Sequence, residues 1–175
     1  MFTKEVSMIQ EYDYDCAPVA IINAYEYFLG NKSYIHEPIY NCLTKICGTD
    51  EDGTTDAGIH RGLRWLLHNS EIRVIRKRKI DYDEIIEFLS TPDQCILLNH
   101  IDYGNEPHVS MFHGVYANWV QGKNIFAGKH KANITKRTFK KYVESSDGVW
   151  FIRRRYVQEM WSNWYENISR SNVEY

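Results

Sequence analysis

The sequence predicts an α+β domain in which a helical half precedes a half built from β-strands. Three observations lead to this fold class. Apolar residues recur at helical spacing in the first part of the chain, the period later changes to that of strands, and no linker rich in Gly, Pro or Ser divides the 175 residues. That length suits a sizeable core, so we expect residues 1–175 to form a single domain.

The helical half begins with a predicted helix over Cys16–Leu29. Pro18 suits its first turn, where no backbone N–H is needed, and Gly30 supplies a stop. A second helix is predicted over Pro38–Cys47, and the loop Gly48–Asp56 leads into a third. The apolar face of this third helix consists of Ile59, Leu63, Leu66 and Leu67.

The second half is predicted to be mainly strands, interrupted by short helices over Asp83–Leu89 and Thr135–Val143. The segment at about 156–175 carries several Trp and Tyr residues, which indicates a C-terminal helical extension packed on the domain. The predicted strands are Ile72–Lys79, Gln94–Asn99, His108–Tyr116, Asn124–Ala127 and Gly148–Arg153.

Composition excludes several classes of function. Hydrophobic residues make up 43% and charged residues 25%, as in globular proteins, and a net charge of −2 provides no basic field for nucleic acid. No apolar stretch is long enough to span a membrane, so no membrane partner is expected. The N-terminus lacks the apolar core of a signal peptide, which predicts a cytoplasmic protein with four reduced cysteines.

Cys16 stands where an acidic, tyrosine-rich loop turns into the first predicted helix. A thiol at a helix N-terminus faces unsatisfied N–H groups and the positive end of the helix dipole, which favours its thiolate. This placement suits a nucleophile, although a cysteine there can also be a small core residue. Attack on a carbonyl would create an oxyanion, and the Gln10 amide and the Cys16 backbone N–H could donate to it.

A cysteine nucleophile needs a proton acceptor, and the chain has seven histidines. His108 opens a predicted strand, which would bring its ring to the end of a sheet where a helix N-terminus can meet it. His100 ends the preceding strand and is the second choice. His113 lies five residues after His108, so strand alternation puts it on the opposite face. We therefore expect His108 to act as the general base.

Three segments recur in this order in one group of enzymes. They are Gln10 with D-C-A-P-V-A around Cys16, Gly48-Thr49 with the helix Gly58–Leu63, and H-V-S-M-F-H-G-V over His108–Val115. Together they resemble papain-like cysteine peptidases, especially the bacteriocin-processing (double-glycine leader) branch. The resemblance covers Gln10 to about Trp150 and implies a helical half packed on an antiparallel sheet half. It also implies thiol-dependent hydrolysis of an amide bond in a peptide or protein substrate.

The sequence departs from this family in two places. Ala17 replaces the glycine that usually follows the nucleophile, and a helical backbone tolerates that change. The family also has an Asp or Asn that orients the imidazole, on the strand after the histidine strand. Here Gly128 falls near that place, and Asn124 follows His108 by 16 residues. Three possibilities follow. Asn124 could orient the imidazole, the site could work as a Cys–His dyad without a third residue, or the site could be impaired.

No cofactor and no metal are expected. Cys42 and Cys47 are five residues apart, unlike the C-x2-C pairs of zinc sites, and Cys95 falls in a predicted buried strand. Two alternatives to a peptidase stay open. The same residues can serve a deamidase or an acyltransferase, and a domain that has lost turnover would be a binding module that retains the cleft.

Overall fold

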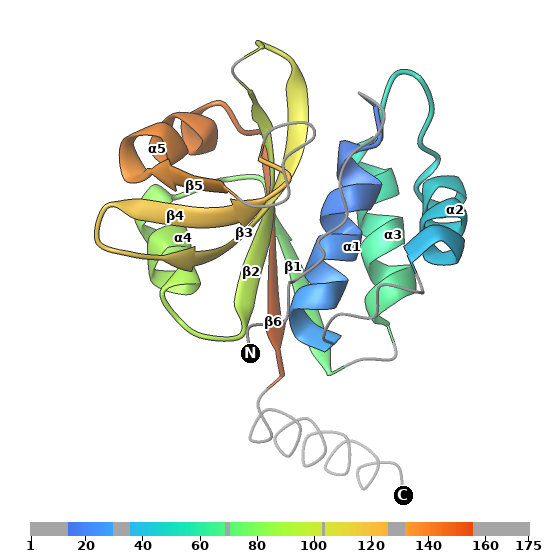
Figure 1. The fold of residues 1–175 in the computed structure, drawn as a ribbon, viewed down its shortest axis with the longest axis horizontal. Helices are drawn as coiled ribbons and strands as arrows, with labels where there is room; N and C mark the ends of the chain where they lie inside the picture. Colours follow the sequence, from blue (N-terminus) through green and yellow to red (C-terminus); the bar gives the residue numbers. More distant parts are fainter. Residues whose placement is uncertain (1–13, 30–35, 69–70, 103, 126–131, 156–175) are drawn as a thin grey trace, which may run out of the picture.

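The computed structural model describes residues 14–29, 36–68, 71–102, 104–125 and 132–155. Figure 1 shows a central sheet with α1, α2 and α3 on one side and α4 and α5 on the other. The helices are α1 (Cys16–Leu29), α2 (His36–Cys47), α3 (Asp56–Leu67), α4 (Tyr82–Leu89) and α5 (Lys136–Glu144). The strands are β1 (Ile72–Lys77), β2 (Gln94–Ile101), β3 (Pro107–Val115), β4 (Trp119–Lys123), β5 (Ala132–Thr135) and β6 (Gly148–Arg154).

The predicted α+β fold, a helical half packed on an antiparallel sheet, is confirmed. The six strands have the order β1-β6-β2-β3-β4-β5, and all the neighbouring strands are antiparallel. The central pair β2 and β3 places His100 directly opposite His108. A register shift between Phe112 and Gly114 interrupts the pairing of β3 with β4.

Side chains of β3 alternate between two apolar cores. Val109 and Met111 pack in the core that includes α1, whereas Phe112 packs in the core under α4 and α5. His108 and Ser110 therefore leave the strand on the same face as Phe112. The alternation sets the surroundings of each polar residue at the start of this strand.

The helices of the first half approach one another closely. At Gly58 of α3, an added Cβ would collide with the Cys47 carbonyl oxygen, and at Gly62 it would lie 2.5 Å from the Cys47 Sγ. Thr55 caps α3 by accepting the Gly58 N–H at 3.2 Å. These contacts fix the loop that precedes α3, and that loop forms one wall of the site described below.

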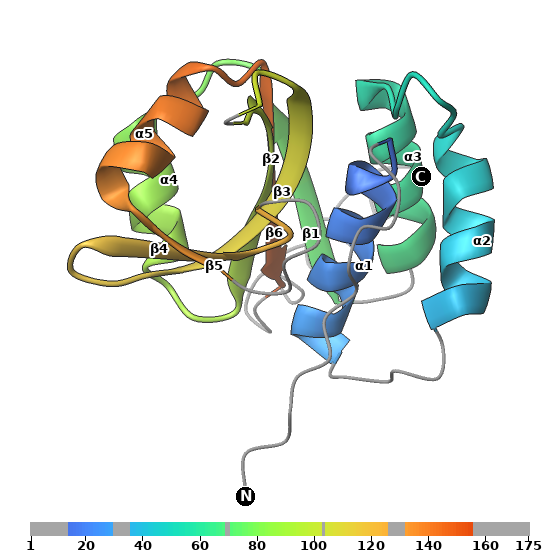
Figure 2. The same cartoon turned by 45° about the horizontal axis from the view of Figure 1, so that its top comes forward.

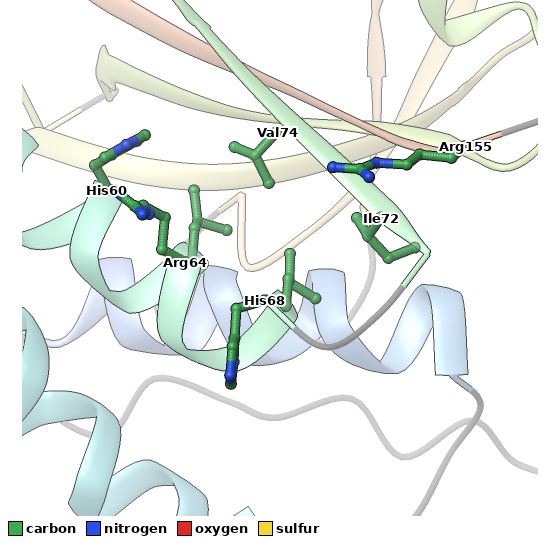
Figure 3. A pocket seen from close by; sticks show the side chains of 8 residues that line it. His60, Arg64, His68, Ile72, Val74 and Arg155 are labelled. Atoms are coloured by element: carbon green, nitrogen blue, oxygen red, sulfur yellow. The ribbon is translucent and has the colours of Figure 1, made fainter. Parts of the chain in front are cut away.

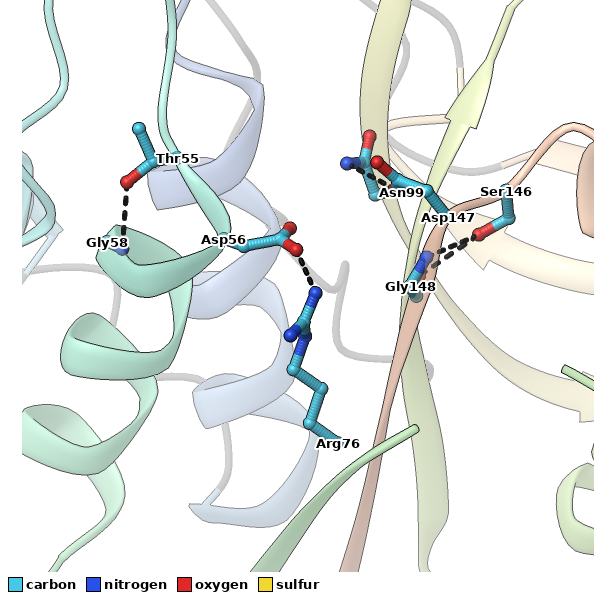
Figure 4. A network of polar contacts seen from close by, with 8 residues as sticks. All are labelled: Thr55, Asp56, Gly58, Arg76, Asn99, Ser146, Asp147 and Gly148. Atoms are coloured by element: carbon cyan, nitrogen blue, oxygen red, sulfur yellow. Dashed lines mark hydrogen bonds and ion pairs between the residues drawn. The ribbon is translucent and has the colours of Figure 1, made fainter. Parts of the chain in front are cut away.

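Two arginines join the helical half to the sheet. Arg76 of β1 forms an ion pair with Asp56 at the start of α3, as Figure 4 shows. The Arg76 guanidinium also lies 5.3 Å from the ring centroid of Trp150. Arg154, at the end of β6, donates to the Phe28 carbonyl at the end of α1.

The structure corrects one predicted strand and adds another. The predicted strand Asn124–Ala127 is wrong over its described part, because β4 comes earlier, at Trp119–Lys123, and Asn124 (φ 52°) and Ile125 follow it in a bend. Phe126 and Ala127 lie outside the described residues. The short strand β5 was not predicted. Gln10 and the C-terminal segment 156–175 lie outside the described residues. Within the described residues, no helix has both the length and the apolar character needed to cross a membrane.

Candidate active site

Cys16 and His108 line one cavity of about 480 Å³, named here the Cys16 cavity. Its walls come from the start of α1, the α2–α3 loop and the β2–β3 turn, which lie at one end of the molecule in Figures 1 and 2. The lining residues are Tyr14, Cys16, Glu51, Asp52, Gly53, Thr54, Asn99, Asp102, Glu106, Pro107, His108 and Val109.

Cys16 is the first residue of α1, as predicted, and its side chain is 8% exposed. Burial raises the pKa of the Cys16 thiol, and the nearby Asp15 carboxylate raises it further. Hydrogen bonds from the backbone of Val109, Ala17 and Cys16 itself act in the opposite direction. Burial is the largest of these effects, so the pKa of the thiol lies above its ordinary value.

Asp15 is itself buried, at 1% exposed. The Tyr40 hydroxyl of α2 donates to its Oδ2 at 2.8 Å, which ties the start of α1 to α2. Its negative charge raises the pKa values of both Cys16 and His108. Asp15 therefore favours a protonated pair over a thiolate, and sequence reasoning had assigned it no such effect.

The His108 ring is held by a main-chain carbonyl. Its Nε2 lies 2.7 Å from the Asn124 backbone oxygen, and the residue is 4% exposed. A carbonyl only accepts, so Nε2 carries the proton and Nδ1 is the basic nitrogen of the neutral ring. Burial lowers the pKa of His108, although the Asn124 carbonyl and the charges of Asp102 and Asp15 raise it in part.

Asn124 therefore meets His108, but through its backbone. The residue is fully buried and adopts φ 52°, a left-handed conformation that asparagine tolerates better than most residues. The sequence predicted that its side chain would leave a strand toward the imidazole. The hydrogen bond that the structure contains instead comes from the carbonyl, which the turn after β4 directs at the ring.

Two further buried residues continue this hydrogen-bonded chain. The Ser110 hydroxyl donates to the Asn124 carbonyl at 3.2 Å, and Ser110 Oγ lies 2.9 Å from His100 Nε2. Because the single serine hydrogen is used on Asn124, His100 Nε2 must donate to Ser110. His100 also stacks on Tyr142, with ring centroids 4.1 Å apart. The His108 ring and the Ser110 hydroxyl thus both donate to the Asn124 carbonyl, and His100 donates to Ser110.

His100, the second choice for the base, does not line the Cys16 cavity. Burial lowers its pKa to about 4, and the neighbouring His108 lowers it too. His113 contacts Tyr27 of α1, with ring centroids 5.2 Å apart, so it lies on the face opposite His108 as predicted. Period-two alternation could have identified Ser110, which shares the face of His108, but nothing in the sequence indicated its bond to Asn124.

A second hollow, of about 380 Å³, lies between α3 and β1 and is named here the α3–β1 hollow. Figure 3 shows His60, Arg64 and His68 along one side of α3, with Arg155 across from them. Its apolar lining consists of Leu63, Leu67, Ile72 and Val74. It contains no cysteine, and its lining includes no carboxylate from the described residues.

The four cysteines, all in described segments, are free thiols. Cys42 is exposed, whereas Cys16, Cys47 and Cys95 are buried. Burial raises the pKa of Cys47 to about 11 and that of Cys95 well above its ordinary value. Over the described segments, no group of three or more His, Cys, Asp or Glu side chains is arranged to hold a metal ion.

No family model matches the sequence, and no curated protein matches it. Solved structures do match. The peptidase domain of Streptococcus ComA, a bifunctional ABC transporter, superposes with a TM-score of 0.62 at 14% identity, covering 85% of this chain and 98% of that one. The fold is papain-like.

Two other structures agree with this papain-like fold. A double-glycine-motif protease from an AMS/PCAT transporter, in complex with the leader peptide, has a TM-score of 0.63 at 11% identity. The match covers 87% of this chain and 93% of that one. A C39-like peptidase from Bacillus anthracis has a TM-score of 0.62 at 9% identity, with 85% and 94% covered. The resemblance to the double-glycine leader peptidases, first noted in short motifs, thus extends over most of the chain.

Proposed function

We propose that this protein is a thiol-dependent amide-bond hydrolase that acts on peptides, with Cys16 as nucleophile and His108 as general base. One observation carries the proposal. A cysteine at a helix start and a histidine of fixed tautomer line the same cavity of a papain-like fold. A peptide substrate is supported by the solved relative that holds a leader peptide.

The proposed reaction has two halves. Cys16 Sγ attacks the amide carbon while His108 Nδ1 takes the thiol proton, and the C–N bond then breaks as the amine leaves with that proton. An acyl thioester remains on Cys16. Water attacks it with His108 again as base, the C–S bond breaks, and the thiol and the product acid are released.

The electrostatics support proton transfer during attack rather than an ion pair formed beforehand. Burial raises the pKa of Cys16 and lowers that of His108, and both shifts favour the neutral thiol and the neutral ring. Negative charge that develops on Sγ meets the backbone groups of Val109 and Ala17, whose hydrogen bonds already favour it. The tautomer held by Asn124 leaves Nδ1 available for the proton.

Gln10 and Asn124 complete the proposed machinery. The Gln10 side-chain amide would donate to the oxyanion, together with the Cys16 backbone N–H, as in the enzymes that the sequence resembles. Asn124 would orient His108 through its backbone carbonyl. Ser110, which donates to the same oxygen, would act as a positioning residue.

A second candidate is a peptide-binding module without turnover. The raised pKa of Cys16 favours it, because a buried neutral thiol is a weaker nucleophile than a thiolate. A deamidase or an acyltransferase would use the same residues with a different acceptor or a different amide. These reactions leave distinct products, so one experiment separates all four outcomes.

The experiment exposes a proteome-derived peptide library to the protein and to its Cys16→Ala variant, and reads the products by mass spectrometry. New peptide termini that require Cys16 support hydrolysis. Side-chain amides converted to acids indicate a deamidase, and newly joined peptides indicate an acyltransferase. If the two proteins give identical libraries and no thioester forms on Cys16, the hydrolase proposal is wrong and the binding module is favoured.

A further inference from the structure

Carboxylates stand on both walls of the Cys16 cavity. Glu51 and Asp52 belong to the α2–α3 loop, and Asp102 and Glu106 belong to the β2–β3 turn. No Lys or Arg from the described residues lines this cavity. The chain as a whole carries a net charge of only −2, so this acidity is a local concentration rather than a property of the entire surface.

The acidic walls are ordered by local hydrogen bonds. Asp102 Oδ1 accepts the backbone N–H groups of Gly104 at 2.7 Å and Glu106 at 3.2 Å, which holds the carboxyl group in one position in the turn. On the other wall, Asp50 Oδ1 accepts the Asp52 N–H at 3.0 Å. A ligand that enters the cavity therefore meets one positioned carboxyl group, that of Asp102, beside the exposed Glu51, Asp52 and Glu106.

The uncharged groups of the cavity also favour a ligand rich in donors. Asn99 donates one amide hydrogen to Asp147 at 3.0 Å, as Figure 4 shows, and its side-chain oxygen can accept. The Thr54 hydroxyl pairs with that of Thr49 at 2.7 Å. His108 Nε2 is committed to Asn124. The lining side chains thus present mainly acceptors and negative charge to an incoming ligand.

We infer that the peptide attacked by Cys16 carries a Lys or Arg side chain close to the scissile bond, held between the two acidic walls. This inference rests on the proposed hydrolase activity and adds a substrate class to it. Ammonium and guanidinium groups supply N–H donors and positive charge, and their hydrogen bonds to carboxylates are stronger than bonds between neutral groups. A cation bound there also stabilises the negative charge that develops on Sγ during attack.

The first test uses thiol-directed peptide ketones as probes of Cys16. Three sets of N-acetylated peptidyl acyloxymethyl ketones differ only in having Lys, Gln or Glu at one of the three positions nearest the reactive group. Acetylation removes the N-terminal ammonium, so only the side chain carries a positive charge. At low ionic strength, the best Lys probe should label Cys16 about tenfold faster than its Glu counterpart, and salt should reduce the ratio.

Matched variants separate the cavity from the overall charge. The triple variant Glu51→Gln, Asp52→Asn, Glu106→Gln removes three charges and leaves Asp102 to hold the turn. The control, Glu71→Gln, Glu87→Gln, Glu144→Gln, removes three exposed charges that do not line the cavity. The preference for Lys should collapse in the first protein and persist in the second. Equal labelling by Lys and Glu probes in the unaltered protein overturns the inference.

A binding measurement keeps this inference separate from the proposed chemistry. The Cys16→Ala protein cannot be labelled at the site, yet its cavity carboxylates are unchanged. A fluorescent acetylated peptide with Lys should bind it with a Kd about tenfold lower than the same peptide with Glu, and the cavity triple variant should remove the difference. If Cys16 is never labelled but this difference is found, the hydrolase proposal fails and the cation site stands. If the difference is absent, the cation site is wrong.

Discussion

The Cys16 cavity and the α3–β1 hollow have similar volumes, about 480 and 380 Å³, but opposite charges. Carboxylates line the first, whereas His60, Arg64, His68 and Arg155 line the second. The hollow has an apolar floor and basic edges, as an anion site would. Size and charge alone therefore do not decide which of the two performs chemistry.

The arrangement of the buried polar groups behind each surface does distinguish them. In the α3–β1 hollow, the His68 Nδ1 bonds to the Trp65 carbonyl of its own helix, and the residue is exposed. In the Cys16 cavity, His108 is buried and its ring donates to the Asn124 backbone carbonyl, which also accepts the Ser110 hydroxyl. A histidine with a fixed tautomer can serve as a base beside a thiol, whereas His68 bonds only within its own helix and lines a hollow without a cysteine.

The largest expected effect is the loss of activity when a reacting group of the Cys16 cavity is removed, compared with changes in the α3–β1 hollow. Cys16→Ala should lower peptide turnover, and His108→Ala should lower both turnover and the labelling rate of Cys16, by on the order of 10³-fold or more, because each removes a reacting group. The matched changes His60→Ala and His68→Ala, in the α3–β1 hollow, should leave the rate within about twofold. Intact-mass labelling kinetics measure both. A comparable loss in the hollow variants would place the chemistry elsewhere.

The second prediction concerns the proposed oxyanion donor. Gln10→Ala should slow turnover by on the order of 10²-fold, as expected when one of two donors is lost, and leave the thermal midpoint unchanged. Gln10→Glu, which keeps the size but replaces the donor with a charged acceptor, should be at least as slow. A normal rate for Gln10→Ala on a verified substrate would limit Gln10 to a packing role.

Sequence reasoning succeeded where a local signal specified the structure. The helix α1 has the predicted bounds Cys16–Leu29, because a proline in the first turn and a glycine after the last residue mark its ends. The strand β4 was missed because W-V-Q-G-K mixes apolar and polar residues without clear alternation, and pairing with β3 defines it instead. Long-range pairing of this kind leaves little trace in one strand.

The candidate site was accessible from sequence only in part. Cys16 and His108 could be predicted as a pair because their types and their places at element ends suit the chemistry. The carbonyl of Asn124 could not, since every residue has one and only the bend after β4 directs it at the ring. The raised pKa of Cys16 could not be predicted from sequence either, because the burial that causes it depends on how β3 packs against α1.

The third prediction uses acid stability to contrast buried and exposed histidines. His100 has a pKa lowered to about 4, so between pH 6.5 and 4 the unfolded chain takes a proton that the folded protein refuses. Stability present above pH 6.5 is lost as the pH falls through this window. From pH 7 to pH 5, His100 should account for a loss of about 2 kcal/mol in the free energy of unfolding.

Urea unfolding of His100→Gln and His68→Gln at the two pH values checks this prediction. The glutamine at 100 keeps an N–H donor for Ser110 but does not titrate, so the loss between pH 7 and pH 5 should shrink by about 2 kcal/mol. His108, whose pKa is also lowered, still contributes in both proteins. The His68 variant should retain the full loss. Equal pH dependence in the two variants would mean that His100 is not kept neutral by burial.

The smallest expected effects come from substitutions at Asn124, which test how His108 is oriented. A substitution that preserves the bend keeps the backbone carbonyl in place. Asn124→Gly keeps the carbonyl and adopts φ 52° without strain, so turnover should fall less than about threefold. Asn124→Ala strains the left-handed backbone by about 1 kcal/mol and displaces the carbonyl, so turnover should fall about tenfold. Asp93→Ala, at φ 57° outside the cavity, should cost similar stability without slowing turnover. Equal losses in the glycine and alanine variants would instead assign the orienting role to the Asn124 side-chain amide.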